Sequence, residues 1–335
     1  MSHLPMSCLI STNDNNELKI LQQLNQVSLN LQARERKKQS KMMTESTKGV
    51  LAMVIACLIW GFSALYYKVL AHIPPIEILA HRTIWSFVLF AILLLAQGRL
   101  SVLFTLLSTR NGVLVVGLAA IMISTNWFAF IFSIQAGYAV EAAMGYYIFP
   151  LVAVLLGRLV FGEKLQSTQW AAVGLAALGV VTLTYGLGVA PWISLLVAGS
   201  FGIYGVLKKR LSVGPVVSVT GEVALLFPIA LGVLAFVHSK GEGHFGTAAW
   251  ENGMLIFSGV LTAAPLMLFS YATHRNRLST VGLLQYINPT AQFFCAVVIF
   301  GEPFGLWHGI AFGLIWLALT LYSASSLLQD RAPRR

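Results

Sequence analysis

The sequence predicts an all-α membrane protein with ten transmembrane helices, arranged as two inverted repeats of five helices each. Three observations support this prediction: apolar runs of spanning length, an asymmetric distribution of Lys and Arg, and an internal repeat. Apolar residues make up 57% of the 335 residues and charged residues only 10%, against roughly 25% charged residues in soluble domains. Too few polar residues remain to cover a soluble globule of this size.

The spans are predicted from apolar runs, several of which reach the ~20 residues that cross a hydrocarbon layer. In chain order they are residues 49–71, 76–97, 112–135, 139–161, 167–187, 190–208, 214–237, 253–274, 279–300 and 304–327. Consecutive helices follow each other closely at 72–76 and at 300–304.

The basic residues alternate between the two sides of these spans. If the N-terminus is cytoplasmic, only Lys68, Arg82 and Lys240 of the 22 Lys and Arg residues lie away from the cytoplasmic side. Cytoplasmic loops carry such an excess of Lys and Arg, and one helix more or fewer would spoil it. We therefore expect both termini in the cytoplasm. The net charge is +10, but the basic residues lie between the apolar runs. We therefore do not expect a nucleic-acid partner.

The two halves of the chain repeat each other. A shift of 139 positions aligns Tyr147 with Tyr286, Pro150 with Pro289 and FGE at 161–163 with FGE at 300–302, and a shift of 141 aligns Gly61 with Gly202. The repeats cover residues 48–188 and 189–328. Since five helices is an odd number, the second repeat enters the membrane from the opposite side. Inverted repeats of this kind are typical of secondary transporters, which bind substrate between the halves.

The FGE motif ends a predicted helix in each repeat. Gly162 and Gly301 can adopt the positive φ that stops a helix. Glu163 and Glu302 then precede the next helix, where a carboxylate interacts favourably with the positive end of the helix dipole. We interpret both glutamates as stabilising a turn at the membrane surface. A direct role in substrate binding is the alternative.

Ionisable residues inside a span are costly and often functional. Glu222 lies about eight residues, or ~12 Å, into its span. The sequence leaves three roles open for Glu222. It is a structural partner of a basic or amide group, or a cavity carboxylate that binds a cation or carries a coupling proton, or a residue that faces lipid. His81 is its repeat counterpart, and Glu77 lies one turn before His81. Arg82 either extends to the outer surface or holds a substrate carboxylate.

Aromatic and amide side chains recur at corresponding depths of both repeats, and their polar atoms must find partners within the bundle. We predict that they line a pocket for a small amphipathic molecule, with interhelical packing as the alternative for each. These candidates are Trp60, Asn126, Trp127, Tyr146, Tyr147, Gln285, Tyr286 and Asn288. Pro150 and Pro289 loosen their helices locally and are hinge candidates, together with Gly202, for which close packing is the alternative.

Long, ordered segments of the chain match a known family. They are IWGFSALYYK (59–68), EILAHRTIWS (77–86), NWFAFIFSIQAGYAVEAAMGYYIFPL (126–151), LTAAPLMLFSYATHRNRLSTVGLLQYINPT (261–290) and FGEPF (300–304). Over residues 48–327 the chain resembles the RarD proteins, the chloramphenicol-sensitive branch of the EamA transporters in the drug/metabolite transporter superfamily. The resemblance implies a ten-helix inner-membrane permease with two EamA repeats.

The ends of the chain differ from that pattern. Residues 1–47 form a cytoplasmic extension, which we expect to be disordered or to result from a mis-called start codon, since Met42 or Met43 would give the usual family start. A short amphipathic helix on the inner surface is another alternative for this extension. Residues 329–335 form a basic cytoplasmic tail.

The predicted function is secondary transport, by alternating access, of small amphipathic metabolites or drugs such as amino acids or chloramphenicol. We expect efflux across the bacterial inner membrane, with protons as a candidate coupling ion. The sequence has no GxxxxGK[ST] loop, which excludes ATP drive by this chain. A non-transporting membrane sensor or partner protein and an intramembrane enzyme are the alternatives, but HExxH, GxSxG and paired aspartates are missing. We therefore expect no catalytic residue and no cofactor. We also expect no metal, because the spacing of Cys8, Cys57 and Cys295 is not that of metal ligands.

Overall fold

The computed structural model describes residues 45–162, 165–188, 190–276, 280–281 and 284–331, and these ranges contain helices and no strand. The predicted extension as far as residue 44, Glu163 and the end of the basic tail lie outside the described residues. The chain divides into two units, residues 1–49 and 50–335. In the first unit, Lys48 Nζ lies 2.9 Å from Glu45 Oε1 on the opening turn of a helix.

Nine of the ten predicted spans correspond to helices with similar bounds, and the exception is the span 279–300. Within the described residues, eight helices are long and apolar enough to cross a membrane. Helix α7 has 18 residues but carries Lys208 and Lys209 in its last turn, and α11 with the segment that continues it covers only Ile287–Ile299. The helices are Glu45–Val69 (the first helix), α2 Pro75–Ala96, α4 Arg110–Ala136, α5 Ala139–Phe161, α6 Ser167–Leu187, α7 Trp192–Lys209, α8 Pro215–Ser239, α9 Ala249–Thr273, α11 Ile287–Phe294 and α12 Leu306–Arg331. The chain is therefore an all-helical, multi-pass membrane protein of two five-helix repeats.

Two segments differ from the prediction. A short helix, α3 Leu100–Ser108, precedes α4 and buries Leu103 against Leu94 and Val217. Its nine residues are too few to cross a bilayer, so a search for spanning runs misses it. The predicted span 279–300 is not one regular helix where it is described, because α11 continues as the π-helix η1, Cys295–Ile299.

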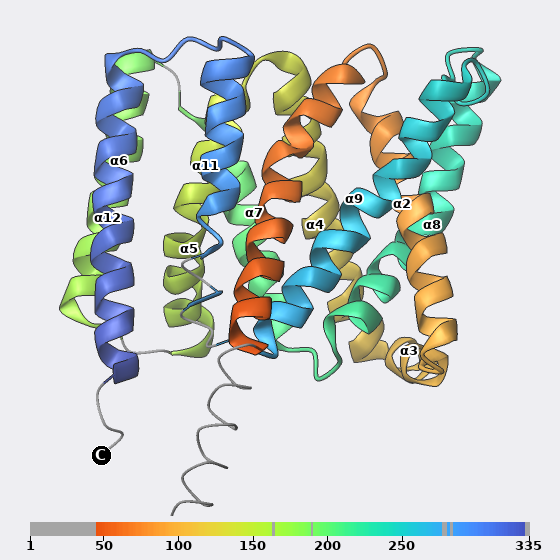
Figure 1. Cartoon of the computed structure of the whole chain (residues 1–335), viewed down its shortest axis with the longest axis horizontal. Helices are drawn as coiled ribbons and strands as arrows, with labels where there is room; N and C mark the ends of the chain where they lie inside the picture. Colours follow the sequence, from red (N-terminus) through yellow and green to blue (C-terminus); the bar gives the residue numbers. More distant parts are fainter. Residues whose placement is uncertain (1–44, 163–164, 189, 277–279, 282–283, 332–335) are drawn as a thin grey trace, which may run out of the picture. The chain divides into compact units, whose positions relative to one another are not determined.

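The helices pair across the two repeats. Helix α6 packs beside α12, α5 beside α7, and α2 beside α8 and α9. In Figure 1, α6 and α12 lie at one side of the bundle, and α2 and α8 lie at the other. Each of these pairs joins a helix of the first repeat to a helix of the second, so side chains in the middle of the bundle come from both repeats.

Two glycines show the same contact in both repeats. A Cβ at Gly61 on the first helix would overlap Ala291 Cβ on α11, and would lie 3.0 Å from the Asn288 carbonyl oxygen. A Cβ at Gly202 on α7 would lie 2.9 Å from Val152 Cγ1 on α5. The first helix of each repeat therefore packs closely on the fourth helix of the other, as inverted symmetry requires.

Replacing Gly61 by Ala is expected to lower the free energy of unfolding by about 1–3 kcal/mol, because the added methyl overpacks a helix contact. Gly202→Ala should cost less, since the neighbouring Val152 and Leu156 side chains can shift. Thermal unfolding in detergent measures this, with a thiol-reactive dye that labels the buried Cys57 and Cys295 as they become exposed. Gly199→Ala is the matched control, because nothing lies within 4 Å of its added Cβ. Equal effects at all three glycines would show that close approach is unimportant.

The predicted turn glycines have the expected backbone. Gly162 and Gly301 both have φ of 68°, and Gly162 is the C-cap of α5. The interpretation of Glu302 needs a correction. Its carboxylate caps the N-terminus of α5, in the other repeat, and not that of α12, which follows it in sequence: Oε1 accepts from Ala139 N at 2.9 Å and Oε2 from Val140 N at 2.8 Å. Glu302 therefore links the repeats.

Candidate functional site

A buried arginine lies where four helices meet. Arg82 on α2 is 6% exposed. Its Nε donates to Thr262 Oγ1 on α9 at 2.9 Å, and its Nη1 donates to the Tyr67 hydroxyl on the first helix at 2.6 Å. The guanidinium carbon lies 4.1 Å from the ring centroid of Trp127 on α4. Arg82 thus points into the bundle and does not extend to the surface.

A second polar group lies on the neighbouring helices. The Tyr146 hydroxyl on α5 donates to Asn126 Oδ1 on α4 at 2.8 Å. Asn126 Nδ2 in turn donates to the Val197 carbonyl and the Ser200 hydroxyl of α7, at 3.0 and 3.3 Å. The amide is 1% exposed and has its polar atoms paired. It therefore has an interhelical packing role, and Tyr146 presents its ring to the bundle.

Aromatic rings connect these two groups. The Phe130 ring lies 5.8 Å from the Tyr67 ring and 5.8 Å from the Tyr146 ring, with edge contacts at both. Edge-to-face contacts of this kind are favourable between ring quadrupoles. The predicted residues Arg82, Trp127 and Tyr146 thus belong to one continuous polar and aromatic cluster. We call Tyr67, Arg82, Trp127, Phe130, Tyr146 and Thr262 the central cluster.

The remaining aromatic and amide candidates do not join the central cluster by any hydrogen bond or ring contact among the described residues. Tyr147 on α5 pairs with Thr290 on α11, with 2.6 Å between the hydroxyl oxygens. Asn288 Oδ1 accepts from Gln292 Nε2 at 3.0 Å. Gln285, Tyr286 and Trp60 are half-buried, and the Trp60 ring contacts that of Phe269. A role of Gln285, Tyr286 and Asn288 in a ligand pocket stays a prediction.

Glu222 pairs with a lysine near the end of α7. Its Oε1 lies 2.6 Å from Lys208 Nζ, and its Oε2 accepts from the Tyr204 hydroxyl at 3.1 Å. Lys208 also donates to the Ser218 hydroxyl. Glu222 is 1% exposed, whereas the Lys208 side chain is 21% exposed. The structural interpretation of Glu222 requires a basic partner, and Lys208 is one. The same ion pair also suits proton transfer, because its lysine is partly exposed.

His81 belongs to a separate group of ionisable residues at the end of the bundle that holds residues 70–76, 240–248 and 300–304. The predicted topology places this end outside, and we call it the outer end. His81 is 3% exposed and stacks on Phe245, with ring centroids 4.9 Å apart. Glu77, fully buried, accepts from His244 N at 2.8 Å and pairs with His244 Nδ1 at 2.9 Å. Glu77 therefore fastens the 240–248 loop onto α2.

The hinge candidates lie in packed segments. Pro150 is inside α5, and Pro289, which is buried, is in α11. Gly202 packs closely against Val152 and Leu156. The close packing of Gly202 was the alternative to a hinge role, and a hinge role at all three positions stays a prediction.

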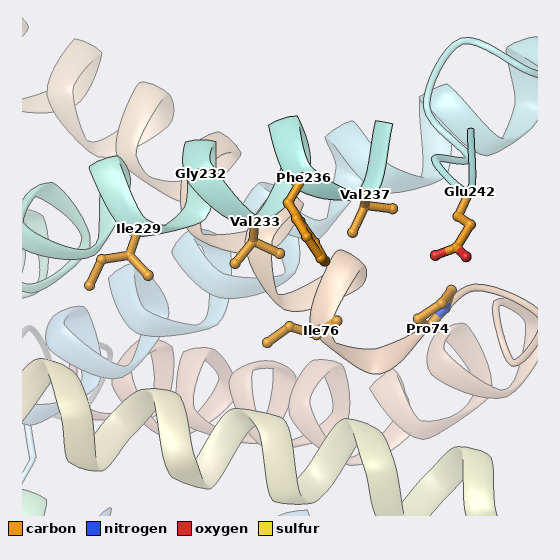
Figure 2. Close-up of a pocket in the computed structure, with 8 residues that line it drawn as sticks. All are labelled: Pro74, Ile76, Ile229, Gly232, Val233, Phe236, Val237 and Glu242. Carbon is orange, nitrogen blue, oxygen red and sulfur yellow. The ribbon is translucent and has the colours of Figure 1, made fainter. Parts of the chain in front are cut away.

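A surface groove lies near the outer end. It has a volume of about 560 Å³ and is lined by Pro74, Ile76, Ile229, Gly232, Val233, Phe236, Val237 and Glu242. Figure 2 shows the α8 side chains pointing toward Ile76, with Glu242 beside Pro74 at one end of the groove. None of the predicted site residues lines it. Among the described residues, no group of three or more His, Cys, Asp or Glu is placed to hold a metal ion.

Several residues of these groups were not predicted. Tyr67 and Thr262 hold Arg82, and His244 pairs with Glu77. Tyr67 belongs to the quoted segment IWGFSALYYK. Its contact with Arg82, 15 positions away, depends on how the first helix and α2 face each other. Lys208 was read only as part of the cytoplasmic charge, because its distance of 14 positions from Glu222 carries no periodic signal.

Comparison with known proteins gives the family. Residues 47–185 and 190–324 each match the EamA-like transporter family. The chain belongs to the EamA-like transporter family. The RarD proteins are close relatives within it: one from Streptomyces exfoliatus is 39% identical over 88% of this chain and 94% of its own length. Another, from Escherichia coli strain K12, is 35% identical over 86% of this chain and 97% of its own length.

A further relative agrees with this membership, and a solved structure has a similar fold. An uncharacterized transporter, YojE of Bacillus subtilis strain 168, is 41% identical over 87% of this chain and 98% of its own length. A solved crystal structure matches with a TM-score of 0.55 and 20% identity, covering 85% of this chain and 98% of that chain. The latter likeness concerns the fold alone. The chain is thus an EamA-family transporter of the RarD kind.

Proposed function

We propose that this chain is a secondary transporter of the bacterial inner membrane, with both termini in the cytoplasm. It moves small amphipathic metabolites or drugs outward by alternating access. The observation that carries the proposal is the central cluster, in which Arg82, Tyr67 and Trp127 of the first repeat meet Thr262 of the second. Transporters with inverted repeats bind substrate near mid-membrane, where the two halves meet.

Proton coupling is assigned in this proposal to Glu222, with His81 as the second candidate. Glu222 is a buried carboxylate whose lysine partner reaches partly to solvent at the opposite end of the bundle from Glu77. Titratable groups buried within membrane spans commonly serve as proton relays. Amino acids and chloramphenicol are the first substrates to test.

The test is flux in proteoliposomes with an imposed pH gradient. Wild-type protein should move at least one compound of an amino-acid and chloramphenicol panel saturably, and faster than protein-free liposomes do. Glu222→Gln should lose the gradient dependence but keep exchange, whereas Glu242→Gln, at an exposed glutamate of the outer end, should keep both. If Glu222→Gln keeps its gradient dependence, Glu222 is structural.

The alternatives give different results in the same assay. A membrane sensor or partner protein would move no compound above the protein-free background although it is folded, and this result would overturn the transport proposal. An intramembrane enzyme would change the compounds chemically, which mass spectrometry of the vesicle contents detects.

A further inference from the structure

The charge of Arg82 is not balanced inside the bundle. Within the described residues, no carboxylate oxygen lies within 4.0 Å of its guanidinium, and its partners are two hydroxyls and an indole ring. Among the described residues the buried carboxylates have other partners: Glu77 pairs with His244 at 2.9 Å, and Glu222 pairs with Lys208 at 2.6 Å. Burying an unpaired charge is costly. An anion that enters the bundle would therefore find a favourable partner in Arg82.

The guanidinium is held in one orientation with a free edge. Thr262 accepts from Nε, Tyr67 accepts from Nη1, and the Trp127 ring covers one face. A guanidinium has five N–H donors. Among the described residues Nη2 has no hydrogen-bond acceptor, and Nη1 has one N–H beyond the one that binds Tyr67. Two parallel N–H groups on one edge match the two oxygens of a carboxylate.

Further unpaired polar groups lie on the same helix. In the described part of the chain, four buried side-chain N or O atoms have no hydrogen-bond partner, and three of them belong to α2: His81 Nε2, Trp85 Nε1 and Ser86 Oγ. Trp85 and Ser86 follow Arg82 by three and four positions, so they neighbour it on the helix surface. His81 is 3% exposed and Ser86 is fully buried. Buried polar groups are normally paired, and a polar ligand beside Arg82 would provide partners for Trp85 and Ser86.

The aromatic part of the central cluster suits the other end of such a ligand. The Trp127 ring lies against the guanidinium, and the Phe130 ring makes edge contacts with the rings of Tyr67 and Tyr146. The Tyr146 hydroxyl is already satisfied by Asn126, so the ring contributes mainly apolar surface. A molecule with a carboxylate at one end and an apolar or aromatic body matches this sequence of groups.

We propose that the transported ligand is an amphipathic carboxylate, bound by two N–H groups of Arg82 with its apolar body against Trp127, Phe130 and Tyr146. Tyr67 and Thr262 are positioning residues that hold the guanidinium. This inference rests on the proposed transport function and narrows its substrate class. Amino acids carry the required carboxylate, and chloramphenicol does not.

The test compares carboxylates with their primary amides, which keep the shape and remove the charge. The probes are 3-phenylpropanoate, indole-3-propanoate and N-acetylphenylalanine, each beside its amide. Binding to the full chain in detergent is measured by a ligand-induced rise in unfolding temperature, and flux is measured by counterflow in proteoliposomes. Wild-type protein should bind at least one carboxylate about tenfold or more tightly than its amide.

Variants assign that preference to Arg82. Arg82→Gln should bind acid and amide equally, and Arg82→Lys should keep only part of the preference, because lysine lacks the planar pair of donors. Lys240→Gln removes an exposed positive charge at the outer end and should keep the full preference. If Arg82→Gln does not fold, the comparison of acids with amides in wild-type protein still decides.

The outcomes separate this inference from the transport proposal. Equal binding of acids and amides by wild type, or a preference that persists in Arg82→Gln, would overturn the carboxylate assignment. Saturable flux of neutral compounds alongside that result would leave transport intact. Tight carboxylate binding without any flux would instead support the binding site and contradict transport.

Discussion

Replacing Lys208 by Met is expected to lower the free energy of unfolding by about 3–5 kcal/mol, because it leaves a buried carboxylate without its cation. Glu222 is 1% exposed and would keep only the Tyr204 hydroxyl, 3.1 Å away. The reverse change, Glu222→Gln, should cost only about 1 kcal/mol. In that variant Lys208 keeps Ser218 and the face of the Tyr204 ring, and its side chain is 21% exposed.

The double variant Lys208→Met/Glu222→Gln should recover most of the stability, because neither charge remains. A double-mutant cycle from thermal unfolding, read by the thiol-reactive dye on Cys57 and Cys295, measures the coupling between the two residues. Lys209→Met is the matched control on the next position of α7, where the lysine is exposed and lies over the Phe161 ring. It should cost less than about 1 kcal/mol.

Equal costs for Lys208→Met and Glu222→Gln would contradict this asymmetry. The two interpretations of Glu222 are also separated, because stability and coupling are different measurements. If the Glu222→Gln protein is nearly as stable as wild type but no longer follows the pH gradient, Glu222 carries the coupling proton in wild type. If the variant is destabilised and still coupled, the Glu222–Lys208 ion pair of wild type is structural.

The sequence predicts the helices well because membrane spans depend on composition over ~20 residues, which is visible locally. The span 139–161 coincides with α5, and the span 214–237 begins one residue before α8, Pro215–Ser239, and ends two residues before the end of that helix. Segments that depend on shorter features are missed, such as α3 with nine residues and the π-helix η1 inside an unbroken apolar run. Apolar patterning has no means of distinguishing a π-helix from an α-helix.

The sequence indicates which residues are candidates for the site, but it does not indicate which of them contact each other. Arg82 and Glu222 can be selected from the sequence because an ionisable side chain inside a membrane span is energetically costly. Their partners depend on which helices face each other in the folded bundle. Thr262 meets Arg82 across 180 positions of sequence, and the repeats must be packed together before that contact exists. Asn288 Oδ1 accepts a hydrogen bond from Gln292 on its own helix, which symmetry between the repeats does not predict. Inverted repeats share a fold and need not share polar partners.

Replacing Glu302 by Ala is expected to lower the free energy of unfolding by about 2–3 kcal/mol, since two charge-assisted hydrogen bonds to a helix N-terminus are lost. Tyr138, the N-cap of α5, makes no side-chain capping bond. The Glu302 carboxylate supplies that cap through Ala139 N and Val140 N, at 2.9 and 2.8 Å. Glu302→Gln keeps one acceptor oxygen without the charge and should lie between wild type and Ala. Thermal unfolding in detergent measures all three.

Glu242→Ala is the control, because it removes an exposed carboxylate at the same outer end and should change stability by less than about 0.5 kcal/mol. The cap joins the two repeats, so its loss should loosen the outer end without touching the central cluster. In counterflow below the unfolding temperature, Glu302→Ala should therefore keep the KM of wild type. A raised KM with an unchanged unfolding temperature would instead mean that Glu302 binds substrate directly, because a cap acts through stability and a ligand contact acts through affinity.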